Sequence, residues 1–119
     1  MSKPFDLEER TYLFAKEVRL FVKQIDRTIS NIEDIKQVVR SSGSVGANYI
    51  EANEHLSKKD FVFRAKICRK EAKESTYWLR LIKEVNNLDD NPILIDLIQE
   101  SIELKKIFSS MIEKSKKSV

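Results

Sequence analysis

The stretch that most constrains the fold is residues 40–53, RSSGSVGANYIEAN, which holds both glycines of the chain, Gly43 and Gly46. Each glycine costs about 1 kcal/mol relative to alanine in a helix interior, so such a run would normally end a helix. The apolar spacing nevertheless continues through it at intervals of three and four residues, at Ile35, Val38, Ser42, Val45, Tyr49, Ala52 and Leu56. We therefore predict one continuous helix whose small residues allow another helix to approach closely.

The same periodicity predicts three further helices, each preceded by a capping residue. The predicted N-terminal caps are Asp6, Ser30, Ser57 and Asn91, and the last of these is followed by a proline. We expect helices at about 6–28, 31–56, 58–88 and 92–115, with the last one fraying from Lys114 onward. Long helices with short connections pack as antiparallel neighbours, which predicts an all-α, up-down antiparallel four-helix bundle in a single domain over residues 1–119. Small residues are expected where helices approach closely in its core, at Ser42, Ala65, Ala72, Ser75 and Ser101.

Composition excludes several classes of protein. No apolar run approaches the roughly 20 residues that a membrane span needs, and the polar N-terminus does not resemble a signal peptide. The single cysteine, Cys68, cannot form an internal disulfide and falls on an apolar face, where we expect an inert core thiol. We therefore expect a cytoplasmic protein with no membrane association.

Positive charge is concentrated in the third predicted helix. Residues 58–83 hold nine Lys or Arg against three Asp or Glu, a net charge of +6, whereas the whole chain carries +3. At about 100° per residue, one stripe opposite the apolar seam contains Lys59, Lys66, Lys70, Lys73, Tyr77 and Arg80. Phosphate contacts beside an aromatic ring are typical of nucleic-acid binding, so these residues and Arg69 are the candidate contacts. A solvated helix face explains the same stripe equally well.

A second face of this helix is apolar. It contains Phe63, Ile67, Trp78 and Leu81, which together would form an exposed patch too costly for a monomer. Either the core is wider than one seam, or these residues form the interface of a homo-oligomer. We favour the interface.

The second helix carries a polar stripe, which we expect on the side away from its seam: Ser41, Ser44, Asn48, Glu51 and His55. Glu51 and His55 are four residues apart and could reach one metal ion, but the sequence offers no further ligand cluster. A glycine-rich phosphate loop and a pair of catalytic carboxylates are also missing. We therefore predict no catalytic residue, no metal, no cofactor and no enzymatic activity.

The residues Arg40, Ser44, Asn48 and Glu51 form a pattern that resembles a family signature, Arg-Ser-x-x-Ser-Ile-x-x-Asn-Ile-x-Glu. This is the signature of the 23S rRNA-intervening-sequence proteins, which are bacterial four-helix-bundle proteins. The similarity continues through residues 58–61 and 67–75 and spans nearly the whole chain.

The resemblance implies a fold and an expectation about partners. Members of the family are encoded within intervening sequences of rRNA genes or stand alone, and most have no assigned activity. The accessory protein of diversity-generating retroelements is similar in fold; it is a homopentamer whose basic surface binds nucleic acid and a reverse transcriptase. By this resemblance we expect a homo-oligomer, with five subunits, and a basic binding surface.

The leading hypothesis is a non-enzymatic, oligomeric helical bundle that binds RNA or DNA through the third helix with little readout of sequence. The alternative is a protein-interaction adaptor or scaffold, for a reverse transcriptase or another nucleic-acid enzyme, whose stripes contact a protein partner.

Overall fold

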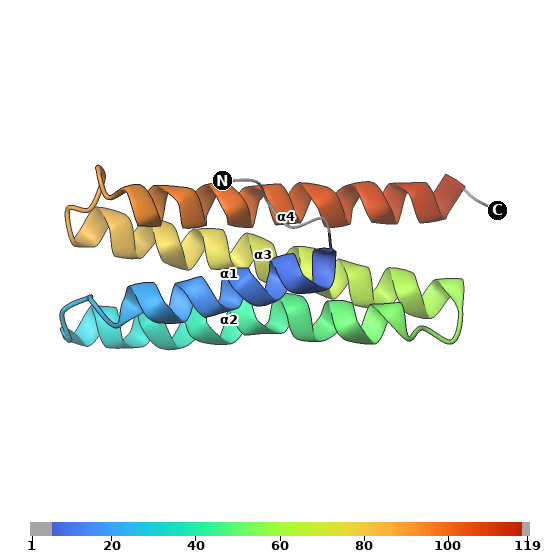
Figure 1. Cartoon of the computed structure of the whole chain (residues 1–119), viewed down its shortest axis with the longest axis horizontal. Helices are drawn as coiled ribbons and strands as arrows, with labels where there is room; N and C mark the ends of the chain where they lie inside the picture. Colours follow the sequence, from blue (N-terminus) through green and yellow to red (C-terminus); the bar gives the residue numbers. More distant parts are fainter. Residues whose placement is uncertain (1–5, 118–119) are drawn as a thin grey trace.

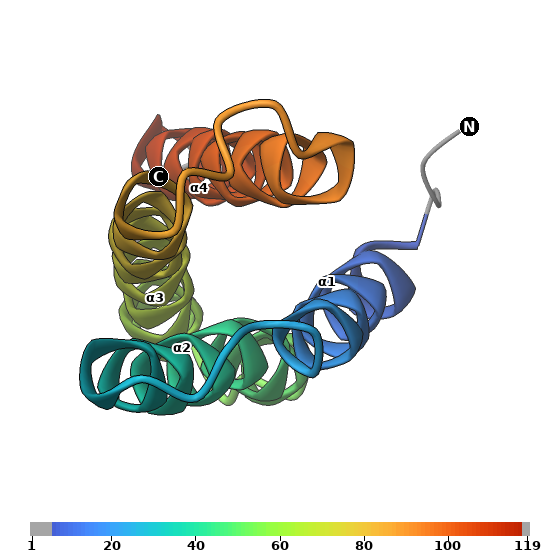
Figure 2. The ribbon, with the colours of Figure 1, turned by 90° about the vertical axis from the view of Figure 1, so that its left-hand side faces the viewer.

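The chain folds into four helices in the computed structural model, which describes residues 6–117. They are α1 (Leu7–Val22), α2 (Ile29–Asn53), α3 (Lys58–Val85) and α4 (Pro92–Lys117). Consecutive helices run in opposite directions and lie side by side (Figure 1). Viewed along the helices, α2, α3 and α4 form three sides of the arrangement, and α1 lies beside α2 (Figure 2) and also contacts α4. The prediction of an all-α four-helix bundle is confirmed, whereas its extent as one domain over residues 1–119 stays a prediction.

The core follows the predicted three- and four-residue spacing. Its largest fully buried side chains include Phe14 of α1, Leu79 and Ile82 of α3, and Phe108 of α4. The predicted small core positions are all buried, at Ser42, Ala65, Ala72, Ser75 and Ser101. Small residues at these positions leave room for the larger side chains of the neighbouring helices, as close packing of a protein interior requires.

The glycine-containing run forms part of α2 without interruption, as predicted. At Gly46, an added Cβ would lie 3.0 Å from the Thr11 Oγ1 atom and 3.3 Å from its Cβ, so α1 approaches α2 closely at this point. At Gly43, an added Cβ would lie 2.9 Å from an Arg19 guanidinium nitrogen. Both glycines therefore face α1, whereas the adjacent Ala47 is exposed.

The predicted boundary between the first two helices is wrong. α1 ends at Val22 instead of residue 28, and α2 begins at Ile29 with Thr28, not Ser30, as its cap. The reason is a tertiary contact: Asn31 is fully buried and donates a hydrogen bond to the Asp26 carbonyl (2.9 Å). Its side-chain amide also exchanges two hydrogen bonds with that of Asn86 at the end of α3 (2.8 and 2.9 Å). These bonds hold residues 26–28 in a compact connection between the two helices.

Other helix ends differ by fewer residues. Leu56 was expected in the apolar seam, but α2 ends at Asn53 and Leu56 is 96% exposed in the turn before Ser57. α3 ends at Val85 instead of residue 88, just before Asn87, whose φ of 55° lies in the left-handed region. α4 continues to Lys117 instead of fraying from Lys114; residues 118–119, the end of the predicted tail, lie outside the described residues. The predicted caps at Asp6, Ser57 and Asn91 are confirmed.

The contact between α1 and α4 rests on Arg10. Its guanidinium donates two hydrogen bonds to the Glu100 carboxylate (both 2.7 Å) and one to Glu103 (3.1 Å). The hydrogen bonds to Glu100 are the main cause of a raised pKa of Arg10. Bidentate pairing of arginine with a carboxylate is geometrically specific, so this contact orients α1 relative to α4. None of the described helices is long and apolar enough to span a membrane.

Candidate nucleic-acid interface

The outer face of α3 carries the predicted basic stripe. Because the seam of α3 points into the core, the opposite side of the helix faces outward. All six members of the stripe are exposed: Lys59, Lys66, Lys70, Lys73, Tyr77 and Arg80. Arg69 is half-buried and lies on the side of α3 near Thr76, which hydrogen-bonds Ser101 of α4 (2.6 Å). Arg69 therefore lies at the edge of the stripe, on the side toward α4.

Two of the stripe cations have acidic neighbours one helical turn away. Lys70 Nζ lies 3.8 Å from Glu74, and Arg80 Nη2 lies 3.7 Å from Glu84. Exposed pairs of this kind contribute little free energy, about 0–1 kcal/mol, and leave the cation accessible to another anion. Within residues 6–117, the other three cations, Lys59, Lys66 and Lys73, form no ion pair. The stripe thus presents positive charge that the fold does not neutralise.

The stripe ends in a groove between the start of α3 and the end of α4. This groove, of about 570 Å³, is called here the lysine groove, and it is lined by Lys58, Lys59, Val62, Phe63, Lys66, Ser115 and Lys116. The sequence prediction missed Lys58 and Lys116 as site residues. Antiparallel pairing of α3 and α4 was the available signal, because it places the lysine-rich end of α4 beside the first turns of α3.

The four residues predicted as an oligomer interface lie in different environments. Phe63 is 59% exposed and lines the lysine groove, whereas Ile67 and Leu81 are half-buried. Trp78 packs against the hydrophobic core, with the Tyr77 ring edge-on to it at 4.9 Å between centroids. A core wider than one seam therefore accounts for Trp78, while Phe63 stays largely exposed, with the Arg64 guanidinium carbon 5.8 Å from its ring centroid.

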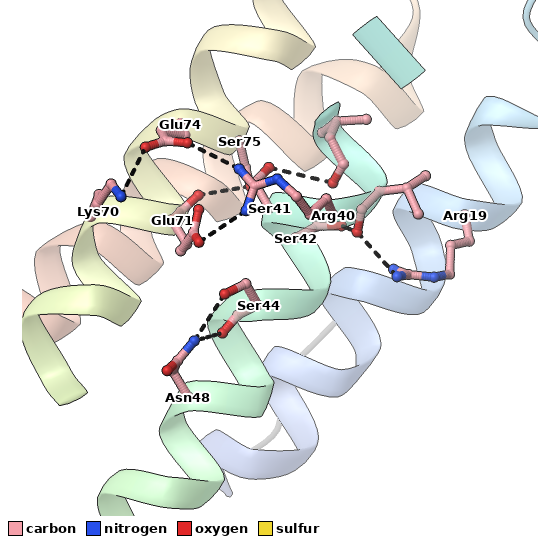
Figure 3. Close-up of polar contacts among 12 residues, drawn as sticks. Arg19, Arg40, Ser41, Ser42, Ser44, Asn48, Lys70, Glu71, Glu74 and Ser75 are labelled. Atoms are coloured by element: carbon pink, nitrogen blue, oxygen red, sulfur yellow. Dashed lines mark hydrogen bonds and ion pairs between the residues drawn. The ribbon is translucent and has the colours of Figure 1, made fainter. Parts of the chain in front are cut away.

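The polar stripe of α2 faces outward only in part: Glu51 and His55 are exposed, Ser44 and Asn48 are half-buried, and Ser41 is buried. Ser41 is fully buried, and its Oγ lies 2.8 Å from the Ser75 Oγ of α3 (Figure 3). The prediction fails at Ser41 because α2 lies between α1 and α3 and so has two buried faces, only one of which forms the apolar seam. The second face is polar and pairs with α3.

Arg40 joins this second face to α3 through two carboxylates. Its Nη1 donates to Glu71 and its Nη2 to Glu74, both at 3.2 Å (Figure 3). The hydrogen bond to Glu71 is the main cause of the raised pKa of Arg40. Glu71 is only 6% exposed, and its Oε1 has no hydrogen-bond partner among the described residues. Arg40 is therefore the main compensation for a buried negative charge.

The other signature residues also make local contacts. Asn48 donates to both the carbonyl and the Oγ of Ser44 (2.9 Å each), and its Oδ1 accepts a hydrogen bond from Arg64 of α3 (3.4 Å). Glu51 is exposed. His55 Nδ1 lies 2.8 Å from the Ala52 carbonyl oxygen, and no cluster of three metal-ligating side chains occurs in residues 6–117. Arg40 and Asn48 thus help to align α2 with α3.

Cys68 lies in the core, where its Sγ donates to the Val45 carbonyl at 3.4 Å. Burial raises the pKa of the thiol to about 12, so it is neutral near pH 7. Because the thiolate is the reactive form, this cysteine is a packing residue, in agreement with the sequence prediction.

Comparisons with known proteins agree with the four-helix fold. The family model described as "23S rRNA-intervening sequence protein" matches residues 4–110. Among solved structures, the chain is similar to a protein of unknown function from the S23 ribosomal protein family of Bacteroides thetaiotaomicron. The two share 27% sequence identity and a TM-score of 0.77, over 90% of this chain and 98% of the other. No curated protein matches the chain.

Proposed function

This chain belongs to the 23S rRNA-intervening sequence protein family, and from that premise we propose that it is a non-enzymatic nucleic-acid-binding protein. It binds RNA or DNA through the outer face of α3 and reads little of the base sequence. The observation that carries the proposal is the exposure of all six stripe residues, three of whose lysines form no ion pair within residues 6–117. Lysine contacts to phosphate give affinity without sequence information.

Assembly would strengthen this surface. We propose a homo-oligomer, with five subunits as the resemblance implies, because Ile67 and Leu81 of α3 are only half-buried in the single chain. Repetition of the stripe in each subunit raises the local potential and allows several contacts to act together on one nucleic acid. The proposed location is the cytoplasm, where RNA and DNA are available to such a protein.

The experiment that tests this function changes Lys66, Lys70 and Lys73 together to glutamine. All three side chains are exposed, so the fold and the assembly should be retained. Binding to unrelated RNA and DNA sequences should weaken to a similar degree, and the slope of log K against log salt should become shallower by about two to three. Fluorescence anisotropy over a salt series measures both quantities, and light scattering checks the mass against multiples of 13.9 kDa.

A matched control removes the same charge elsewhere. Lys16, Lys23 and Lys36 are exposed on the α1–α2 side of the bundle, and their replacement by glutamine should leave most of the affinity and slope intact. If both triple variants bind like the parent, the basic stripe is only solvated and the protein-interaction adaptor becomes the better hypothesis. If both lose affinity equally, binding follows net charge and not the stripe.

A further inference from the structure

The lysine groove combines charge with an exposed aromatic ring. We propose that it binds an unpaired nucleobase, stacked on Phe63 with the flanking phosphates held by lysines, so that the protein prefers single-stranded to duplex nucleic acid. This inference rests on the proposed function and names the class of nucleic acid that it serves.

The first support is the lining of the groove. Four of its seven residues are lysines, from both α3 and α4, and no acidic residue lines it. Its apolar part consists of Val62 and Phe63, and Phe63 is 59% exposed. A nucleotide has the same two parts, an anionic phosphate and a flat apolar base face. Base stacking on aromatic side chains beside a basic surface is the usual way in which proteins bind single strands without sequence preference.

The size of the groove agrees with such a ligand. Its volume of about 570 Å³ falls within the range of roughly 300–1,000 Å³ that holds small organic ligands. It lies at the end of the basic stripe, since Lys59 and Lys66 belong to both. A strand whose backbone follows the stripe along α3 therefore reaches the groove without leaving the positively charged surface.

Duplex nucleic acid cannot use Phe63 in this way. In a double helix the faces of the bases are covered by their neighbours, and a protein contacts phosphates and groove edges. The lysines and the arginine of the stripe serve duplex and single strand alike, whereas the exposed ring of Phe63 adds affinity only where a base is unpaired. Phe63 is thus the residue that separates the two classes of ligand.

A second copy of the chain is a poorer occupant of the lysine groove. The buried centre of a subunit interface is depleted of charged residues, above all lysine. In the lysine groove, Lys58, Lys59 and Lys66 accompany the exposed ring of Phe63. Burial of these charges against a protein surface would cost desolvation energy, whereas phosphates compensate them directly.

The test compares three labelled 12-residue ligands by fluorescence anisotropy: an oligothymidylate, a strand of the same length with abasic sites, and a duplex. The parent should bind the oligothymidylate about tenfold more tightly than the abasic strand, since a stacked base typically contributes that much or more. Phe63→Leu keeps an apolar side chain without the aromatic face, and it should remove this difference while leaving abasic and duplex binding unchanged. Phe63→Tyr keeps the aromatic ring and should keep the preference of the parent for the oligothymidylate.

The outcomes separate this inference from the proposed function. A parent that binds all three ligands equally, with steep salt dependence, keeps the proposed function and overturns the stacking site. A parent that binds none of them overturns both. If Phe63→Leu still prefers the oligothymidylate to the abasic strand, the stacking site is wrong. If this variant keeps that preference and also shows a lower molecular mass in light scattering, Phe63 contacts a protein surface.

Discussion

The inward and outward sides of α3 both carry charge, yet they hold it differently. On the side facing α2, the buried Glu71 is bound by Arg40 from the neighbouring helix. On the outer side, the lysines are exposed and have at most a weak partner on their own helix. A buried carboxylate is costly unless it is paired, so the inward charges specify which helices meet. The outward charges cost little and remain available to a partner molecule.

The largest loss of stability is expected from Gly46→Leu, on the face of α2 that packs against α1. The added side chain must displace Thr11, which already lies 3.0 Å from the position of a Cβ at residue 46. Overpacking should outweigh the better helix propensity of leucine and lower the free energy of unfolding by about 3 kcal/mol. Urea denaturation measures this change. Ala47→Leu, one residue away but exposed, is the control and should stay within about 0.5 kcal/mol of the parent; equal stability of the two variants would contradict the close approach of α1.

A smaller loss of stability is expected from Arg40→Ala. This change leaves the Glu71 carboxylate buried without its partner, and complete burial would cost about 3–5 kcal/mol. Because the Arg40 side chain is 53% exposed, solvent can replace part of the interaction, and we expect about 1–2 kcal/mol.

Lys73→Ala removes one positive charge from the outward side and serves as its control. The difference in the free energy of unfolding between the two variants measures how much more the Arg40 contacts contribute than an exposed lysine. In urea denaturation at neutral pH, Arg40→Ala should be the less stable of the two. Equal stability of the Arg40 and Lys73 variants would show that the contacts of Arg40 to α3 are unimportant for the fold.

The smallest signal is expected at Cys68. Its thiol should react very slowly with a thiol reagent in the folded protein at pH 8. Its thiol pKa is raised to about 12 by burial, against about 8.5 in an unfolded chain. The stability that depends on the neutral thiol is therefore fully present below pH 8.5 and is lost as the pH rises toward about 12. Absorbance after addition of the reagent, with and without denaturant, measures the protection. Equal rates in the two conditions would place Cys68 outside the core.

The helices could be predicted from the sequence because each apolar seam repeats at one helical period. The boundary near residue 28 could not, since it depends on the pairing of Asn31 with Asn86, 55 residues away. The local sequence favours Ser30 as the N-cap of α2 as well as it favours Thr28. Long-range hydrogen bonds between polar side chains leave no periodic signal in a single sequence.

The outer stripe was also predictable, because on a helix the surface is whatever lies opposite the seam. The lysine groove was not, since Lys59 and Lys116 lie on different helices and meet only through the pairing of α3 with α4. The buried position of Ser41 was missed for a related reason. A helix with neighbours on two sides has a second buried face, and small polar residues on it look like solvent-facing ones.

The bridge from Arg10 to Glu100 has a consequence for how the chain folds. α1 pairs with α2, α2 with α3 and α3 with α4, so most helix contacts join segments that are close in sequence. Such a low contact order favours rapid folding. The bridge joins residues 90 apart. Closing so long a loop costs conformational entropy, and this cost falls once the α1–α2, α2–α3 and α3–α4 pairs have packed. We therefore expect docking of α1 on α4 to be a late step of folding.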